Sequence, residues 1–356
     1  MNIFVIGINH KTSSIEQREK FYLQPTEREL LLSEFKSDPT ITEALIVSTC
    51  NRTEVYANLI YRDPEIPLQH LLRIKGIHLN SEECGSLFYS YANEEAIEHL
   101  FRVAGGLDSL VLGEKQILGQ LKDAIELSRK KGMLAQEFNI LADTAIRVGK
   151  KARAETQIGY GGSSISWAAV TMANKLIGNT QDKSVLVIGS GKMGKLAAGH
   201  LKEKGFAKIY VMNRTLDNAE AVAQRFGAEV VSYWDMRDIL AHVDVCICSA
   251  GAPHYIIEKR LVAEVMTRRA QRKLVCIDIS MPRNIDPQVS GVDNVSLLII
   301  DDLEKAIEDN NDRRRLAVGD AEKIILSKVD EFYRKLAKRN LMQQTGLDRL
   351  LQPQKG

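Results

Sequence analysis

The sequence is poor in the features that mark disulfide-rich, metal-binding or membrane proteins. Of its 356 residues, 6% are aromatic, eight are proline and five are cysteine, and the cysteines form no CxxC pair and no metal-site spacing. This favours a reduced, cytoplasmic chain over a disulfide framework. The longest apolar runs span a few residues, well short of the roughly 18 that cross a bilayer, and the amino terminus lacks a basic start and a cleavage site.

Charge of either sign is not in excess. Forty-eight Lys and Arg residues stand against 46 Asp and Glu residues, a formal net charge of +2. That balance excludes a strongly cationic nucleic-acid binder but leaves room for a local basic face. With 44% hydrophobic and 26% charged residues, the composition is that of an ordinary globular protein with no membrane partner.

The pattern of apolar residues predicts an α/β multidomain chain. Few strands and several helices in the first part indicate an α+β domain over 1–158. Three glycines, Gly159, Gly161 and Gly162, then indicate a hinge or tight turn. Strands expected at 184–188, 208–212, 243–248 and 274–278 alternate with helices, which predicts a Rossmann-type parallel-sheet domain over 159–300. Residues 301–356 are expected to form a long connecting helix and the remnant of a further domain.

The connecting helix is expected from Asp302 to about Gln343, a stretch without proline and with one glycine. A single helix of that length would be about 60 Å long, which suits a strut between domains or subunits. Its apolar residues form a stripe that one domain alone is not expected to cover. We therefore expect Phe332, Leu336 and Leu341 to respond to association with a second copy.

A nucleotide-binding turn is indicated by Gly189, Gly191 and Gly194, which directly follow an apolar strand and open a helix. The first glycine permits the tight turn, the second lets the backbone approach a pyrophosphate, and the third allows close helix–strand packing. The helix amino terminus supplies N–H donors to the phosphates. The whole turn is the predicted cofactor site, with Ser190, Lys192 and Met193 between the glycines. The alternative is a glycine-rich turn without a ligand.

The end of the second strand of this domain reads Asn213-Arg214-Thr215. An NAD site usually has an acidic residue there for the ribose hydroxyls, whereas Asn213 carries no charge that repels a 2′-phosphate. Arg214 and Thr215 offer a cation and a hydroxyl to bind that phosphate. This favours NADPH over NADH, the alternative being an exposed loop arginine. The loops after later strands, 249–253 and 278–282, are expected to flank the nicotinamide.

Cys50 differs from the other four cysteines, whose apolar or unremarkable surroundings indicate packing. It lies where an apolar strand gives way to a polar turn, two residues before Arg52. A nearby positive charge lowers the pKa of a thiol and stabilises the thiolate. Cys50 is therefore a candidate nucleophile, with a structural strand-end cysteine as the alternative.

Several motifs in order resemble those of glutamyl-tRNA reductases. They are Ser-Thr-Cys-Asn-Arg-Thr-Glu at 48–54, Gly-Ile-Asn-His-Lys-Thr at 7–12, the segment 106–120, Glu-Thr-Gln-Ile-Gly at 155–159, Gly-Ser-Gly-Lys-Met-Gly at 189–194 and Asn-Arg-Thr at 213–215. The resemblance extends over nearly the whole chain to about residue 330. It implies NADPH-dependent reduction of glutamyl-tRNA to glutamate 1-semialdehyde, the first committed step toward 5-aminolevulinate and porphyrins.

The resemblance also implies roles for individual residues. Cys50 would be the nucleophile and His99 would assist catalysis, either as an acid or as a positioning group. The glutamyl group would be held by Thr49, Asn51, Arg52, Ser109, Glu114, Lys115, Gln116 and Gln120.

The chemistry of these residue types fits that activity. A thiolate attacking the aminoacyl ester would leave a thioester, a better hydride acceptor than the ester. Arg52 suits a two-pronged contact with the substrate side-chain carboxylate, and Glu54 or Glu114 suits the α-ammonium group.

Two other functions stay open at this point. One is a non-catalytic NADP-binding or tRNA-binding regulatory paralogue, against which Cys50, Arg52, His99 and the phosphate loop argue together. The other is a small-molecule oxidoreductase of the shikimate-dehydrogenase kind, which needs no nucleophilic cysteine. Family members usually continue into a helical dimerisation domain, most of which this sequence lacks. We therefore expect a homodimer weaker than the family norm, with glutamate-1-semialdehyde aminomutase as a further partner.

Overall fold

The computed structural model describes residues 2–109, 112–156, 158, 164–303 and 312–344. Contacts divide the chain into two units: Met1–Gly162 together with Asp312–Gly356, and Ser163–Asn311. Among the described residues, no helix combines the length and hydropathy that a membrane span requires.

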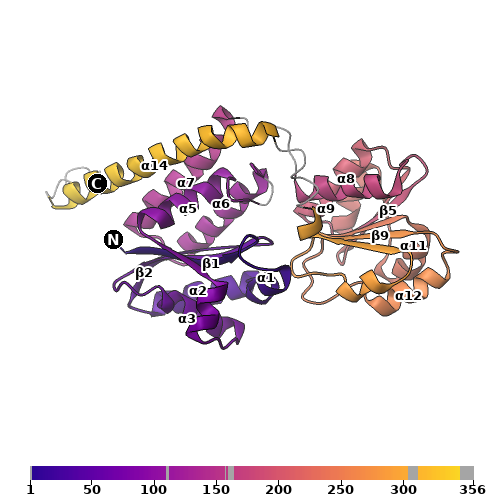
Figure 1. Cartoon of the computed structure of the whole chain (residues 1–356), viewed down its shortest axis with the longest axis horizontal. Helices are drawn as coiled ribbons and strands as arrows, with labels where there is room; N and C mark the ends of the chain where they lie inside the picture. Colours follow the sequence, from indigo (N-terminus) through magenta and orange to yellow (C-terminus); the bar gives the residue numbers. More distant parts are fainter. Residues whose placement is uncertain (1, 110–111, 157, 159–163, 304–311, 345–356) are drawn as a thin grey trace, which may run out of the picture. The chain divides into compact units, whose positions relative to one another are not determined.

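The first unit is built on a four-stranded antiparallel sheet of order β2-β3-β1-β4. Its strands are β1 (Ile3–Asn9), β2 (Ile41–Thr49), β3 (Arg52–Leu59) and β4 (Tyr89–Ala92). The first three strands are buried along most of their length, because helices cover both faces of the sheet (Figure 1). This matches the predicted α+β organisation, although the short strand β4 was not expected.

Helices of the first unit form one layer on each face of this sheet, with a separate hydrophobic core under each layer (Figure 1). One layer consists of α1 (Ile15–Phe21), α2 (Pro25–Ser37), α3 (Glu65–Lys75) and α4 (Ser81–Leu87). The other consists of α5 (Glu94–Gly105), α6 (Lys115–Lys130) and α7 (Gln136–Glu155). Glu43 on β2 anchors the second layer, because its Oε1 accepts hydrogen bonds from the backbone N–H groups of Ala135 and Phe138 at the start of α7.

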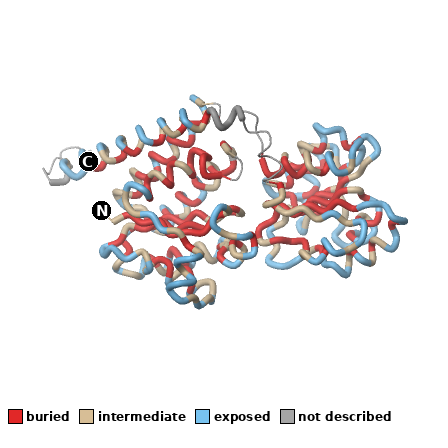
Figure 2. Tube along the Cα trace, viewed as in Figure 1, coloured by how far each residue is buried: buried red, intermediate tan, exposed pale blue. Residues whose placement is uncertain are grey.

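The C-terminal helix α14 (Asp312–Gln344) packs against α5 and α7 of the first unit. Its buried apolar residues belong to the same core as those helices. Buried positions recur along the helix, on the side that faces the rest of the unit (Figure 2). Phe332 is fully buried and Leu336 is 6% exposed, whereas Leu341 is 61% exposed. We expected that the chain itself would leave these apolar side chains exposed. This is wrong for Phe332 and Leu336, because α14 packs onto the layer of α5 and α7 and buries both side chains. The part of the predicted helix over 304–311 lies outside the described residues.

The second unit is a parallel six-stranded sheet of order β10-β9-β8-β5-β6-β7 with helices on both faces (Figure 1). Its strands are β5 (Ser184–Ile188), β6 (Lys208–Met212), β7 (Glu229–Val230), β8 (Val245–Cys248), β9 (Leu274–Asp278) and β10 (Val295–Ile299). Its helices are α8 (Ile165–Ile177), α9 (Lys192–Glu203), α10 (Leu216–Phe226), α11 (Met236–His242) and α12 (Lys259–Thr267). The strand order reverses at β5, as in doubly wound dinucleotide-binding folds. The predicted Rossmann-type sheet is thus confirmed.

Candidate functional site

Cys50 and Asn51 form the two-residue loop of the β2–β3 hairpin, since Thr49 pairs with Arg52 across the strands. The loop is fixed by two hydrogen bonds. The backbone N–H of His10 donates to the Asn51 carbonyl at 3.0 Å, and the Asn51 N–H donates to Oγ1 of Thr49 at 3.2 Å. The hairpin therefore presents Cys50 at the end of the sheet on a constrained backbone.

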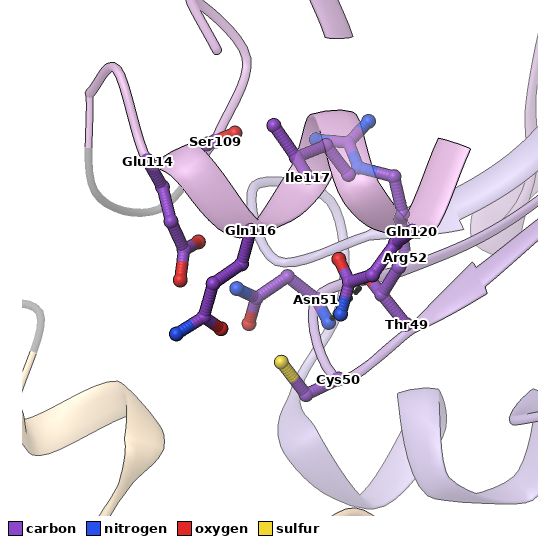
Figure 3. A pocket seen from close by; sticks show the side chains of 9 residues that line it. All are labelled: Thr49, Cys50, Asn51, Arg52, Ser109, Glu114, Gln116, Ile117 and Gln120. Atoms are coloured by element: carbon purple, nitrogen blue, oxygen red, sulfur yellow. Dashed lines mark hydrogen bonds between the residues drawn. The ribbon is translucent and has the colours of Figure 1, made fainter. Parts of the chain in front are cut away.

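A pocket opens beside this loop and contains most of the predicted substrate residues (Figure 3). The helix α6 supplies one wall, because positions 116, 117 and 120 lie on one helical face, and Glu114 is its N-cap residue. The lining residues are Thr49, Cys50, Asn51, Arg52, Ser109, Glu114, Gln116, Ile117 and Gln120. Lys115 belongs to α6, but its side chain lies outside the described part of the chain.

Three polar atoms of this pocket are buried without a hydrogen-bond partner among the described residues. They are Oδ1 of Asn51, Oγ of Ser109 and Nε2 of Gln116. Leaving a buried polar group unpaired costs about 1–3 kcal/mol, so native proteins satisfy such groups with protein, water or ligand. Asn51 Oδ1 is an acceptor, Gln116 Nε2 is a donor and the Ser109 hydroxyl can act as either, so this pocket suits a ligand that carries both hydrogen-bond donors and acceptors.

The pKa of the Cys50 thiol is not lowered overall, in contrast to what the neighbouring Arg52 led us to expect. Burial raises its pKa to about 12, the nearby Glu114 carboxylate adds to this rise, and Arg18 and Arg52 oppose it. The effect of Arg52 is small because its guanidinium is paired with the carboxylates of Glu54 and Asp108. Cys50 therefore carries its proton at neutral pH in the free protein.

Arg52 is itself almost completely buried and lines the pocket with its guanidinium directed away from the Cys50 sulfur (Figure 3). Its Nη1 donates to Oε1 of Glu54 and, at 3.2 Å, to Oδ2 of Asp108, while its Nη2 donates to the backbone carbonyl of Asp108. A two-pronged contact with a substrate carboxylate would have to displace these partners. The geometry thus assigns Arg52 to holding the hairpin against the segment that carries Ser109.

His99 and Glu54 lie in a buried cluster next to the pocket and do not line it. Nε2 of His99 is 2.9 Å from Oε1 of Glu54, and its Nδ1 is 3.9 Å from Oδ2 of Asp108. Glu54, His99 and Asp108 have the spacing of a metal site. However, Arg52 and Lys11 already pair with these carboxylates, so the cluster is charge-balanced without an ion.

The predictions missed this cluster, which also includes Tyr56 and Tyr89. A signal was present in the sequence: Arg52, Glu54 and Tyr56 alternate along one strand, so their side chains share a face. Polar residues repeating at that interval in an otherwise apolar strand indicate a buried polar network or a wet face. Asp108 and Tyr89 join from distant segments, which strand periodicity does not reveal.

In the second unit, the glycine turn has the geometry of a phosphate cradle between β5 and α9. Gly189 has a φ of +101°, and a Cβ there would lie 2.8 Å from the Ala250 nitrogen. A Cβ on Gly194 would lie 1.9 Å from the Gly189 carbonyl oxygen, so only glycine allows this helix–strand approach. Gly191, the N-cap of α9, faces open space. The residues present therefore fit a dinucleotide pyrophosphate.

The residues Asn213, Arg214 and Thr215 follow β6 at the carboxyl edge of the sheet. Arg214 and Thr215 are exposed, and Arg214 makes no hydrogen bond or ion pair with the described residues. In the turn itself, Ser190 is buried, Met193 is half-buried and Lys192 is exposed. Beyond β8 and β9, Asn284 donates from Nδ2 to the carbonyls of Ala252 and His254, at 2.8 and 3.0 Å. Ala252 belongs to the expected loop 249–253, and Asn284 lies two residues after the expected loop 278–282.

Comparison with known proteins gives a consistent result for both units. Residues 6–156 match the family described as glutamyl-tRNAGlu reductase, N-terminal domain. Residues 171–306 match the family described as shikimate / quinate 5-dehydrogenase.

Similarity to individual proteins extends over nearly the whole chain. A glutamyl-tRNA reductase of Citrifermentans bemidjiense is 39% identical over 95% of this chain and 78% of its own length. That of Bacillus subtilis is 39% identical over 93% of this chain and 73% of its own. The solved structure of glutamyl-tRNA reductase from Methanopyrus kandleri is 33% identical, covers 99% of this chain and 88% of that one, and has a TM-score of 0.53.

Proposed function

Because the chain belongs to the glutamyl-tRNA reductase family, and is therefore an oxidoreductase of the first step of tetrapyrrole synthesis, we propose that it reduces glutamyl-tRNA through a thioester on Cys50. The observation that carries this proposal is the pocket at the hairpin loop, which contains Cys50 and the polar atoms of Asn51, Ser109 and Gln116 that have no partner among the described residues. A non-catalytic paralogue would have no use for a nucleophile in that setting.

In the first step, Sγ of Cys50 attacks the carbonyl carbon of the glutamyl ester. The bond to the tRNA ribose oxygen breaks, and that oxygen leaves as a hydroxyl after taking up a proton, so that one proton lost by the thiol balances one gained by the tRNA. With the thiol pKa at about 12, the proton has to leave as the sulfur attacks. Glu114, whose carboxylate raises this pKa and lines the same pocket, is the acceptor that we assign.

The glutamyl group is held by the polar wall of the pocket. Asn51 Oδ1 accepts from the α-ammonium group, and Ser109 Oγ and Gln116 Nε2 donate to the side-chain carboxylate; these contacts would satisfy the three unpaired atoms. Thr49 and Gln120 complete the wall. Of the two carboxylates considered for the ammonium group, Glu54 does not line the pocket, and Glu114 is assigned to the Cys50 proton, so Asn51 Oδ1 is the contact we propose for the ammonium group.

The glycine turn would hold NADPH, and the chemistry this cofactor would supply is the hydride that reduces the thioester to the aldehyde and frees the Cys50 sulfur as a thiolate. The backbone of Gly189, Ser190 and Gly191 and the amino terminus of α9 would hold the pyrophosphate. Arg214 and Thr215 would bind the 2′-phosphate, with Lys192 and Met193 on the helix side of the turn. A homodimer, hand-over of product to glutamate-1-semialdehyde aminomutase and a cytoplasmic location stay predictions.

The test uses glutamyl-tRNA charged with radiolabelled glutamate, with and without NADPH. Without NADPH, the wild-type protein should retain label on Cys50, and with NADPH it should release glutamate 1-semialdehyde in proportion to the cofactor oxidised. Cys50→Ser should do neither while binding NADPH as before, and Cys84→Ser is the control for removal of a thiol. Aldehyde production by Cys50→Ser at the wild-type rate would rule out the thioester.

A further inference from the structure

Three residues form a row across the sheet of the first unit, one on each of three adjacent strands. Gly7 on β1 pairs with Glu54 on β3 and with Tyr89 on β4. Directly opposite residues of antiparallel strands project to the same face of the sheet. The side chains of Glu54 and Tyr89 thus approach each other above Gly7, and Oη of Tyr89 donates to Oε1 of Glu54 at 2.5 Å.

The missing side chain of Gly7 is what allows this approach. A Cβ at this position would lie 2.7 Å from Cγ of Glu54, 3.0 Å from Oη of Tyr89 and 3.1 Å from the Thr53 carbonyl oxygen. The first distance is shorter than two carbon atoms can approach without displacement. Any other residue at position 7 would therefore push Glu54 and Tyr89 out of their present positions.

The Glu54 carboxylate is enclosed by donors from three elements. Its Oε1 accepts from Arg52, Tyr89 and, at 2.9 Å, Nε2 of His99, and its Oε2 accepts from Oη of Tyr56 at 2.7 Å. Burial acts to raise the pKa of Glu54, but Arg52, His99 and the hydrogen bonds hold it well below its usual range. The group is therefore an anion with its acceptor sites filled, and its rotamer is fixed by its donors.

Two of these donors, Arg52 and His99, connect Glu54 to the site that we propose for catalysis. Arg52 adjoins the hairpin loop of Cys50 and binds the carbonyl of Asp108, the residue before Ser109. His99 has Nε2 committed to Glu54, which orients the ring and its other nitrogen. A shift of Glu54 would move both, although Glu54 itself does not line the pocket.

We propose that Tyr89 and Gly7 are positioning residues of the reductase: the Tyr89 hydroxyl, reaching Glu54 across Gly7, fixes that carboxylate and through it Arg52 and His99. The proposal rests on the proposed function of the Cys50 pocket. Neither residue lines the pocket beside Cys50. They act by keeping the hairpin loop of Cys50 and the ring of His99 in place. Small displacements of reacting groups lower the reaction rate strongly.

Tyr89→Phe tests the proposal, with Tyr91→Phe as the matched control. Both rings lie near His99, at centroid distances of 5.5 and 5.2 Å, but the Tyr91 hydroxyl forms no hydrogen bond within the described residues. We expect Tyr89→Phe to slow label transfer to Cys50 at saturating glutamyl-tRNA by about tenfold or more, the effect of one hydrogen bond to a charged group. The half-saturating tRNA concentration and NADPH affinity should stay within twofold, and Tyr91→Phe should match the wild type.

A second variant tests the gap at Gly7. Gly7→Ala should slow label transfer more than Tyr89→Phe does, because it displaces both neighbours. Adding Tyr89→Phe to Gly7→Ala should cost nothing further, since the hydrogen bond is already lost and the smaller ring relieves part of the clash. Losses that multiply in the double variant would overturn the proposal. So would a Tyr89→Phe protein with the wild-type rate per folded molecule.

The thioester proposal is tested by the wild-type protein, and the positioning proposal is tested by the variants. If Cys50 forms no thioester, the wild-type protein itself retains no label, and the proposed function falls. If label transfer in the wild type is normal, only the Tyr89 and Gly7 variants bear on the positioning proposal.

Discussion

The backbone N–H of Ser190 donates a hydrogen bond of 3.2 Å to Oδ1 of Asn213, and so links the phosphate-binding turn to the end of β6. Nδ2 of the same asparagine donates to the Thr215 carbonyl at 2.9 Å. Asn213 therefore has a structural role besides carrying no charge that would repel a 2′-phosphate. Its side-chain amide connects the glycine turn to the loop that follows β6. Arg214, between the two anchored residues, extends into solvent.

Arg214→Ala should therefore weaken NADPH binding and leave NADH binding almost unchanged, since only NADPH carries a 2′-phosphate. The expected loss is about tenfold, the size of one charge-assisted hydrogen bond at an exposed site. Fluorescence titration with each cofactor measures it, and Arg225→Ala on α10 controls for the loss of an exposed cation from the same unit. Equal losses for both cofactors would instead assign Arg214 a role in the fold of the loop.

Alkylation of Cys50 by iodoacetamide should report the raised pKa of its thiol. With a pKa of about 12, the thiolate fraction rises tenfold for each pH unit across the accessible range. We expect the rate of Cys50 modification, followed by peptide mass spectrometry, to climb from pH 7 to 9 without levelling off. A plateau near pH 7 would mean that the thiol is already activated in the free protein.

Glu114→Gln should raise this alkylation rate at a fixed pH of 8, because the Glu114 carboxylate adds to the rise in the thiol pKa. The same variant should slow label transfer from glutamyl-tRNA if Glu114 accepts the proton. These opposite directions separate the electrostatic effect of the carboxylate from its catalytic role.

Much of the nucleotide-binding unit could be predicted from sequence because its signals are local. Gly189, Gly191 and Gly194 stand at fixed offsets from an apolar strand, and each has the geometric role that its position implies. The strands β5, β6 and β9 have the predicted limits. Two strands at the edges of the sheet were missed: β10, and the two-residue strand β7, which is too short to give a periodic signal.

The site of the first unit could be predicted only in part, because its electrostatics depend on contacts between distant segments. Cys50 and Arg52 are neighbours in sequence, so a lowered thiol pKa was a reasonable hypothesis. Asp108, some 56 residues away, and Glu54 take up the charge of Arg52. Burial then dominates at Cys50, and no local pattern reports burial at a hairpin loop.

Asp278 should make the stability of the second unit depend on pH. Burial raises its pKa from 3.8 to about 6, against the opposing effect of hydrogen bonds from the backbone of Ser280, Asn284 and Ile285. The folded chain therefore takes up a proton that the unfolded chain has lost, so stability falls as pH rises from about 4 through 6. The difference between the folded and unfolded pKa of Asp278 corresponds to a loss of roughly 3 kcal/mol in the free energy of unfolding over this pH range.

Thermal unfolding from pH 4.5 to 7.5 measures this effect against Asp278→Asn, which cannot ionise. The variant loses one acceptor and should be the less stable protein at pH 4.5. Its disadvantage should shrink as the pH rises, because only the wild type then carries a buried charge. Parallel curves for the two proteins would contradict a raised pKa at Asp278.

Leu336 should stabilise the first unit from within the chain, because α14 seats it against α5 and α7. Leu336→Ala removes a side chain that is 6% exposed, and such truncations cost about 2–5 kcal/mol. Leu341→Ala, on the same helix at 61% exposed, should change the free energy of unfolding by less than about 0.5 kcal/mol. Urea unfolding of both variants at two protein concentrations decides the matter. A loss for Leu336→Ala that is the same at both concentrations places its contacts inside one chain, whereas a loss that disappears at high concentration would mean that a second copy covers this residue.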